Sequence, residues 1–121
     1  MKQLLFIGLG SGIGGMLRYG VFLLWHSKEP NAFPWATLLV NLLGSFLIGG
    51  IFALAAKENI SNETRLFLAT GILGGFTTFS AFSYECLEMF RHEQWIMGLL
   101  YISSSILGGI ILAFLGYLLA K

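Results

Sequence analysis

The residues best suited to bind an ion lie in one run near the middle of the chain, which reads GILGGFTTFSAFS over residues 71–83. Within this run, Phe79 and Phe82 share one helical face, and Ser80 and Ser83 share a neighbouring face. An aromatic ring is electropositive at its edge, so two ring edges and several hydroxyl groups could hold a small anion without a full positive charge. Taken singly, each phenylalanine is better explained by packing.

The same run is a poor helix-forming sequence. Gly74 and Gly75 are adjacent, and the β-branched residues Thr77 and Thr78 follow them closely. We therefore predict a break in the helix at about residues 74–78, which would leave main-chain carbonyl groups without helical partners. Inside a bilayer, such a break is tolerated only where protein buries it or where it lines a cavity, and its carbonyl groups can bind a monovalent cation. The alternative is a glycine kink filled by neighbouring side chains.

Other polar residues have two interpretations each. The amide of Asn41 has two N–H donors that must be satisfied inside a bilayer, so it either faces an ion or joins two helices. Glu85, Glu88 and His92 fall on one helical face and could bind a metal. Because they lie near Arg91 at the polar end of an apolar segment, a solvated helix end explains them better.

The amino-acid composition shows whether the helices that position these residues lie in water or in a membrane. Of the 121 residues, 56% are hydrophobic and 11% are charged, whereas soluble domains carry about 25% charged residues. A chain this small cannot bury so much apolar surface in its own core, so most of that surface must face a lipid bilayer. The net charge of +1 excludes a basic nucleic-acid-binding protein.

Four apolar stretches reach the length of roughly 20 residues that a membrane-spanning helix needs. They cover residues 4–25, 33–56, 66–89 and 95–120. Charged and turn-forming residues lie between them, at Lys28, Glu29, Asn31 and Pro34, in residues 57–65 including Asn59, Ser61 and Asn62, and at residues 91–93. The apolar runs do not alternate with a period of two, which excludes a barrel. We predict an all-α membrane protein that forms a single domain over residues 1–121, with its third helix broken near the middle.

This architecture excludes one motif and leaves no sign of an enzyme. Residues 10–15 match the dinucleotide-binding pattern G-x-G-x-x-G, and Glu29 lies near the expected distance. That pattern requires a preceding β-strand and a βαβ unit, which a small membrane bundle cannot contain. No arrangement of nucleophile and base indicates an active site.

Small residues recur at helical spacing and predict close contacts between membrane helices. The predicted faces are Gly8, Gly12, Gly15 and Tyr19 in the first span, Thr37, Asn41, Gly44 and Ser45 in the second, and Gly98, Tyr101, Ser105 and Gly108 in the fourth. Basic residues are nearly balanced across the membrane, with Lys2, Lys57, Arg65 and Lys121 on one side and Arg18, Lys28 and Arg91 on the other. So weak a bias is compatible with insertion in both orientations or in one.

Three motifs together resemble the CrcB/Fluc family of fluoride channels. They are GGMLRY at residues 14–19, TLLVNLLGSF at residues 37–46 and GGFTTFSAFS at residues 74–83. The resemblance covers essentially the whole chain. It implies a passive fluoride exporter of the prokaryotic plasma membrane, built as an antiparallel, dual-topology dimer of four-helix subunits with two pores. The partner would be a second copy of the chain or a homologous sister subunit.

The resemblance also implies roles for single residues. Asn41 would line the pore, Phe79 and Phe82 would bind fluoride through their ring edges, and Arg18 would attract anions at a vestibule. Hydroxyl groups of Ser80, Ser83, Tyr101 and Ser105 would line the ion path, and the carbonyl groups of Gly74 and Thr77 would bind a structural Na⁺ on the dimer axis. The chain departs from the family at Ala81, where threonine is common, and at Gly109, where relatives often carry a hydroxyl group.

Two other functions compete with this interpretation. A small multidrug antiporter also has about four spans, but proton coupling needs a carboxylate inside the membrane. The six acidic residues are expected in loops or at the end of the third span, which disfavours an antiporter. A subunit that only assembles with others through its glycine faces is the second alternative.

Overall fold

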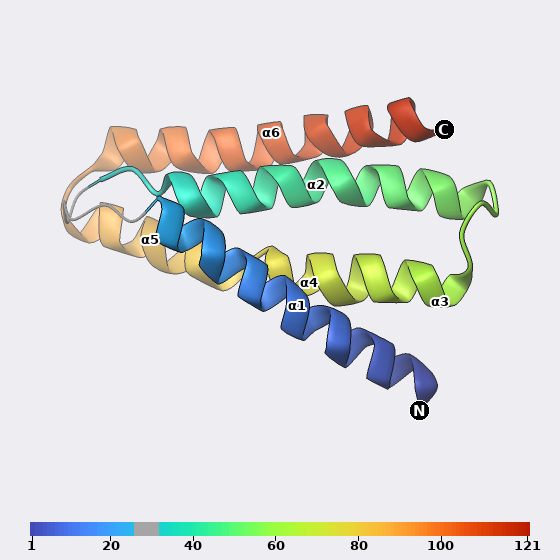
Figure 1. Cartoon of the computed structure of the whole chain (residues 1–121). Helices are drawn as coiled ribbons and strands as arrows, with labels where there is room; N and C mark the ends of the chain where they lie inside the picture. Colours follow the sequence, from blue (N-terminus) through green and yellow to red (C-terminus); the bar gives the residue numbers. More distant parts are fainter. Residues whose placement is uncertain (26–31) are drawn as a thin grey trace.

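A computed structural model describes residues 1–25 and 32–121, and within these residues all regular secondary structure is helical (Figure 1). The elements are α1 (Lys2–Leu24), α2 (Trp35–Ala56), α3 (Asn62–Arg65), the π-helical segment η1 (Leu66–Leu73), α4 (Gly74–Phe76), α5 (Phe79–Arg91) and α6 (Trp95–Ala120). Segments α3 to α5 follow one another as a single long span over Asn62–Arg91, so the described chain has four helices long and apolar enough to cross a membrane. The predicted all-α membrane fold is confirmed.

Two helices end within two residues of the prediction, at Leu24 and not at residue 25, and at Arg91 and not at residue 89, and three helices begin elsewhere than predicted. The first helix begins at Lys2 and not at residue 4. The second begins at Trp35 and not at residue 33, because Pro34 has non-helical dihedral angles. The third begins at Asn62 and not at residue 66, because the hydroxyl of Ser61 accepts a hydrogen bond from the Thr64 N–H at 3.1 Å and caps the helix there.

Asn62 was therefore wrongly assigned to a loop, and the second connection is shorter than predicted. The first predicted junction, with Lys28, Glu29 and Asn31, lies outside the described residues.

The chain ends and the α2–α3 connection lie at the same end of the bundle, as four spans require (Figure 1). Helices α2 and α6 run side by side and contact each other along much of their length. Glycines permit this close approach: a Cβ atom at Gly49 would overlap the carbonyl group of Ala113, and one at Gly116 would overlap that of Phe46. The predicted face of α6 contributes as well, since Gly108 lies against the side chain of Leu42.

Helix α1 packs against η1 and α4 through glycines other than the predicted ones. Gly10 and Gly14 are buried, and a Cβ atom at Gly14 would overlap the carbonyl group of Ile72. At Gly8 and Gly12, which belong to the predicted face, an added Cβ would meet no atom of residues 1–25 and 32–121 within 4 Å. The prediction is wrong for contacts inside the chain because α1 carries two glycine stripes, and helical spacing alone does not say which one faces inward.

Candidate functional site

The third span is interrupted at Thr77 and Thr78, inside the predicted range of 74–78. Both residues are extended, with ψ angles of 156° and 116°. The main-chain N–H and the hydroxyl of Thr77 each donate to the carbonyl of Leu73 at 2.9 Å, which ends α4. The hydroxyl of Thr78 accepts from the N–H of Ala81 at 3.2 Å, which begins α5. The two threonines therefore stabilise the ends of the two half-helices that they separate.

Asn41 joins α2 to this break. Its amide nitrogen donates to the carbonyl of Thr78 at 3.1 Å, and its amide oxygen accepts from the N–H of Thr78 at 2.8 Å. The interhelical contact considered as one interpretation of Asn41 is thus present. An amide nitrogen carries two N–H groups, so one donor remains for another ligand.

The break also removes the helical donors of main-chain carbonyl groups, including those of Gly74 and Thr77. In a continuous helix, the N–H groups of Thr78 and Ala81 would bond to the carbonyls of Gly74 and Thr77. Here those N–H groups bond to Asn41 and to the Thr78 hydroxyl instead. The two carbonyls predicted to bind a cation are therefore among those that lose their helical donors.

A groove of about 300 Å³ lies beside the break. It brings together four of the predicted site residues, Asn41, Gly74, Thr77 and Phe79. Phe79 is 78% exposed in the single chain, so the groove is open along that side. The remaining lining residues are Gly44, Ser45, Ile48, Ala69, Leu73 and Thr78. None of the described residues that line the groove is charged.

A row of aromatic rings leads from this groove into the bundle. The ring centroids of Phe79 and Phe82 are 5.7 Å apart, and those of Phe82 and Tyr101 are 5.0 Å apart. Tyr101 is fully buried and also makes an edge contact with Phe33 at 5.4 Å. The two predicted phenylalanines and the predicted tyrosine thus form a continuous set of contacts across α5 and α6.

The three serines predicted to line the ion path differ in burial and in their hydrogen-bond partners. Ser80 is exposed, with its hydroxyl 3.3 Å from that of Thr78, so it belongs to the edge of the break. Ser83 is also exposed, and it is not among the residues lining the groove. The hydroxyl of Ser105 is buried and has no hydrogen-bond partner among the described residues. A buried hydroxyl without a partner is costly, so it is a candidate contact for a small ligand.

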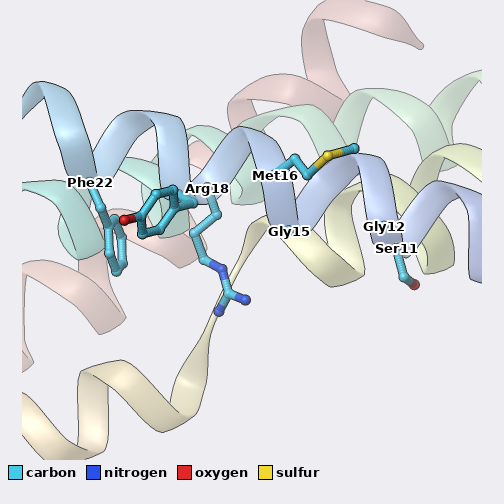
Figure 2. Close-up of a pocket in the computed structure, with 7 residues that line it drawn as sticks. Ser11, Gly12, Gly15, Met16, Arg18 and Phe22 are labelled. Carbon is cyan, nitrogen blue, oxygen red and sulfur yellow. The ribbon is translucent and has the colours of Figure 1, made fainter.

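Arg18 lies apart from the first groove, in a shallow depression of about 630 Å³ on the outer side of α1. All the residues that line this depression belong to α1: Ser11, Gly12, Gly15, Met16, Arg18, Tyr19 and Phe22. Figure 2 shows Ser11, Arg18 and Phe22 pointing to the same side of the helix. The two grooves share no lining residue, so Arg18 is not among the residues that line the groove with Asn41 and Phe79.

Glu85 is the polar residue that the sequence interpretation placed wrongly. Its carboxylate turns inward and accepts hydrogen bonds from the hydroxyl of Thr37 at 3.0 Å and from that of Tyr101 at 3.1 Å. The expected solvated helix end does describe its neighbours: Glu88 pairs with Arg91 at 2.7 Å, and the ring of His92 contacts the carbonyl of Glu88. Glu85 lies three residues after Phe82, and this shared helical face was the available signal.

Known proteins resemble this chain over nearly its full length. The family model described as "CrcB-like protein, Camphor Resistance (CrcB)" matches residues 5–117. A protein of Thermus thermophilus named "Fluoride-specific ion channel FluC" is 48% identical over 117 residues, which cover 97% of this chain and 94% of the relative. A protein of the same name from Rhizobium meliloti is 43% identical over 122 residues, covering 100% of this chain and 98% of the relative.

Proposed function

The chain belongs to the CrcB family, and we propose that it is a fluoride-selective channel that exports fluoride passively from the cytoplasm of a prokaryote across its plasma membrane. Such export would lower the toxicity of fluoride to the cell. The observation that carries the proposal is the uncharged groove at the break of the third span, where Asn41 and Phe79 meet. The family consists of transport proteins and not of enzymes, and the chain itself is a multi-pass membrane protein.

An uncharged groove suits the central problem of fluoride conduction, which is dehydration. Fluoride is small and strongly hydrated, so a pore must replace its water with hydrogen-bond donors. A lysine or arginine in the groove would bind the ion too tightly to release it, whereas conduction requires several sites of moderate strength. The second N–H of Asn41 and the exposed ring of Phe79 supply such sites without a formal charge.

The ion path would continue from the groove along the aromatic row. The ring of Phe82 contacts that of Phe79. The hydroxyl of Ser105, which has no partner among the described residues, offers a further donor. Ser80 and Ser83 would contribute at the exposed edge. Arg18 would act at a vestibule, where a positive charge raises the local concentration of anions without holding them in the pore. Transport out of a negative interior is then favourable by about 2.3 kcal/mol per 100 mV.

We propose that two subunits are needed, because one chain leaves the relevant faces uncovered. Phe79 is largely exposed, and the glycine stripe of Gly8 and Gly12 faces open space. A second copy in the opposite orientation, or a homologous sister subunit, would cover these faces and close the groove. Small residues allow the close helix approach that membrane association uses. The near balance of basic residues on the two sides is consistent with insertion of the chain in both orientations.

A structural Na⁺ fits the carbonyl groups released at the break. Gly74 and Thr77 offer two oxygen atoms in each chain, and an antiparallel partner would add two more at the axis between the subunits. Main-chain carbonyls of a broken helix are ligands that Na⁺ accepts in membrane proteins. The ion would hold the two breaks together and compensate the partial negative charge of four carbonyl groups.

Fluoride efflux from liposomes tests the proposal. Purified protein in liposomes loaded with potassium fluoride should release fluoride when valinomycin sets the membrane potential, as recorded with a fluoride electrode. Phe79→Ile should reduce that rate strongly, because isoleucine retains bulk but lacks a ring edge. Unchanged efflux in Phe79→Ile would refute the ring-edge role. Proton-coupled cation uptake, or no flux at all from the wild-type protein, would instead favour one of the two alternative functions.

A further inference from the structure

We propose that Glu85 is a positioning residue of the ion path: its carboxylate fixes the hydroxyl of Tyr101 and, through the tyrosine ring, the ring of Phe82. The inference rests on the proposed channel function. It concerns a residue outside the groove, and it assigns to Tyr101 a role different from that of a hydroxyl ligand for fluoride.

The first support is that Glu85 connects three helices at one point. It lies on α5 and accepts hydrogen bonds from Thr37 on α2, at 3.0 Å, and from Tyr101 on α6, at 3.1 Å. Thr37 is 1% exposed and Tyr101 is 0% exposed. Hydrogen bonds between buried groups and a carboxylate are strong, so this contact fixes the relative placement of the three helices.

The second support is the geometry around the tyrosine ring. The ring of Tyr101 lies between those of Phe33 and Phe82, at centroid distances of 5.4 and 5.0 Å. Because its hydroxyl is held by Glu85, the ring has a defined orientation, and Phe82 packs against it. Glu85 and Phe82 also lie three residues apart on α5, so the residue that fixes the tyrosine is on the helical face that presents the phenylalanine.

The third support is the number of available protons. A tyrosine hydroxyl has one proton to donate, and that of Tyr101 is donated to Glu85. The same holds for Thr37. Neither hydroxyl can donate to an anion while it bonds to the carboxylate. Tyr101 therefore contributes to the path through the position of its ring.

Four variants test this inference in the fluoride-efflux assay, with the wild-type rate as reference. Glu85→Ala removes the acceptor and leaves the hydroxyl of Tyr101 without its partner, so the rings of Tyr101 and Phe82 lose their fixed position and we expect a loss of roughly tenfold or more in rate. Glu85→Gln keeps the shape and can still bond to both hydroxyl groups, so we expect a rate within about threefold of wild type. Glu88→Ala, one turn further along and paired among the described residues with the exposed Arg91 alone, is the matched control and should conduct normally.

The fourth variant, Tyr101→Phe, is made alone and together with Glu85→Ala. If the two residues act through one contact, the double variant should conduct as slowly as the slower single variant, because effects within one interaction are not additive. Effects that multiply would mean that the Tyr101 hydroxyl acts independently, and they would overturn the inference. So would a wild-type rate in a correctly assembled Glu85→Ala protein.

Glu85→Gln decides the matter if the alanine variant does not fold, as judged by size-exclusion chromatography. A rate near wild type supports positioning, whereas a loss beyond about tenfold would show that the charge itself is required and would refute the inference. Failure of the proposed function is distinguished by the wild-type protein, which would then show no fluoride efflux. In that case none of the variants would release fluoride either.

Discussion

The amide of Asn41 and the main chain of Thr78 are paired through two hydrogen bonds, one donated by each residue, at 3.1 and 2.8 Å. At the break, the N–H of Thr78 bonds to Asn41 and not to the carbonyl of Gly74, which would be its partner in a continuous helix. The pairing also places a polar side chain of α2 against the groove that contains Phe79. One residue thus stabilises the interrupted helix and supplies the remaining N–H donor of the proposed ion site.

Removal of the Asn41 amide should impair both stability and conduction. In Asn41→Ala the N–H of Thr78 loses its partner and the C=O of Thr78 loses one of its donors, which should lower the free energy of unfolding by about 1–3 kcal/mol. Thermal unfolding in detergent and fluoride efflux from liposomes measure the two effects. Ser104→Ala is a suitable control, because that exposed hydroxyl bonds, within the described part of the chain, to the carbonyl of Leu100 in its own helix and to nothing else. Wild-type stability and efflux in Asn41→Ala would contradict the dual role.

The two glycine stripes of α1 should respond differently to alanine. Gly14→Ala places a methyl group onto the carbonyl of Ile72 and should destabilise the protein by roughly 1–3 kcal/mol, the usual cost of overpacking. Gly8→Ala introduces the same group where none of the described residues of the chain lies within 4 Å, so its effect should appear in the dimer fraction and not in the packing of α1 on η1. Thermal unfolding of Gly14→Ala is compared with that of the wild-type protein. A wild-type unfolding temperature in Gly14→Ala would show that α1 does not pack against η1 through Gly14.

The outward stripe of α1 should carry the contact between subunits. Gly12→Leu adds a large side chain to this open face, so we expect a lower dimer fraction by light scattering in detergent and a loss of fluoride efflux. Leu107→Ala, at an exposed position on α6, is the control and should leave the mass unchanged. A Gly12→Leu protein with wild-type mass and rate would place the subunit contact elsewhere.

Sodium should stabilise the protein if the carbonyls of Gly74 and Thr77 bind it. A ligand that binds only the folded state at a hundredfold excess over its dissociation constant adds about 2.7 kcal/mol to the stability. The unfolding temperature should therefore be higher in sodium chloride than in N-methyl-D-glucamine chloride at equal ionic strength. Equal unfolding temperatures in the two salts would argue against the site.

Much of the architecture follows from local properties of the sequence. Four apolar stretches of sufficient length and low charge determine four membrane helices, because the bilayer requires internal hydrogen bonding over a fixed thickness. The adjacent glycines and threonines of residues 74–78 determine where the third span breaks, since helix propensity depends mainly on the residues themselves. Serine is a favoured N-cap residue, so Ser61 was a local signal for the start of the helix at Asn62, although the prediction placed both residues in a loop.

What the tertiary structure decided is which side of each helix faces inward. Helical spacing identified Gly8 and Gly12 as a stripe, but packing against η1 selects Gly10 and Gly14. Spacing also grouped Glu85 with Glu88, yet only Glu85 meets hydroxyl groups from two other helices. The rotation of a helix about its axis depends on contacts with residues far away in the chain, and no local pattern contains that information.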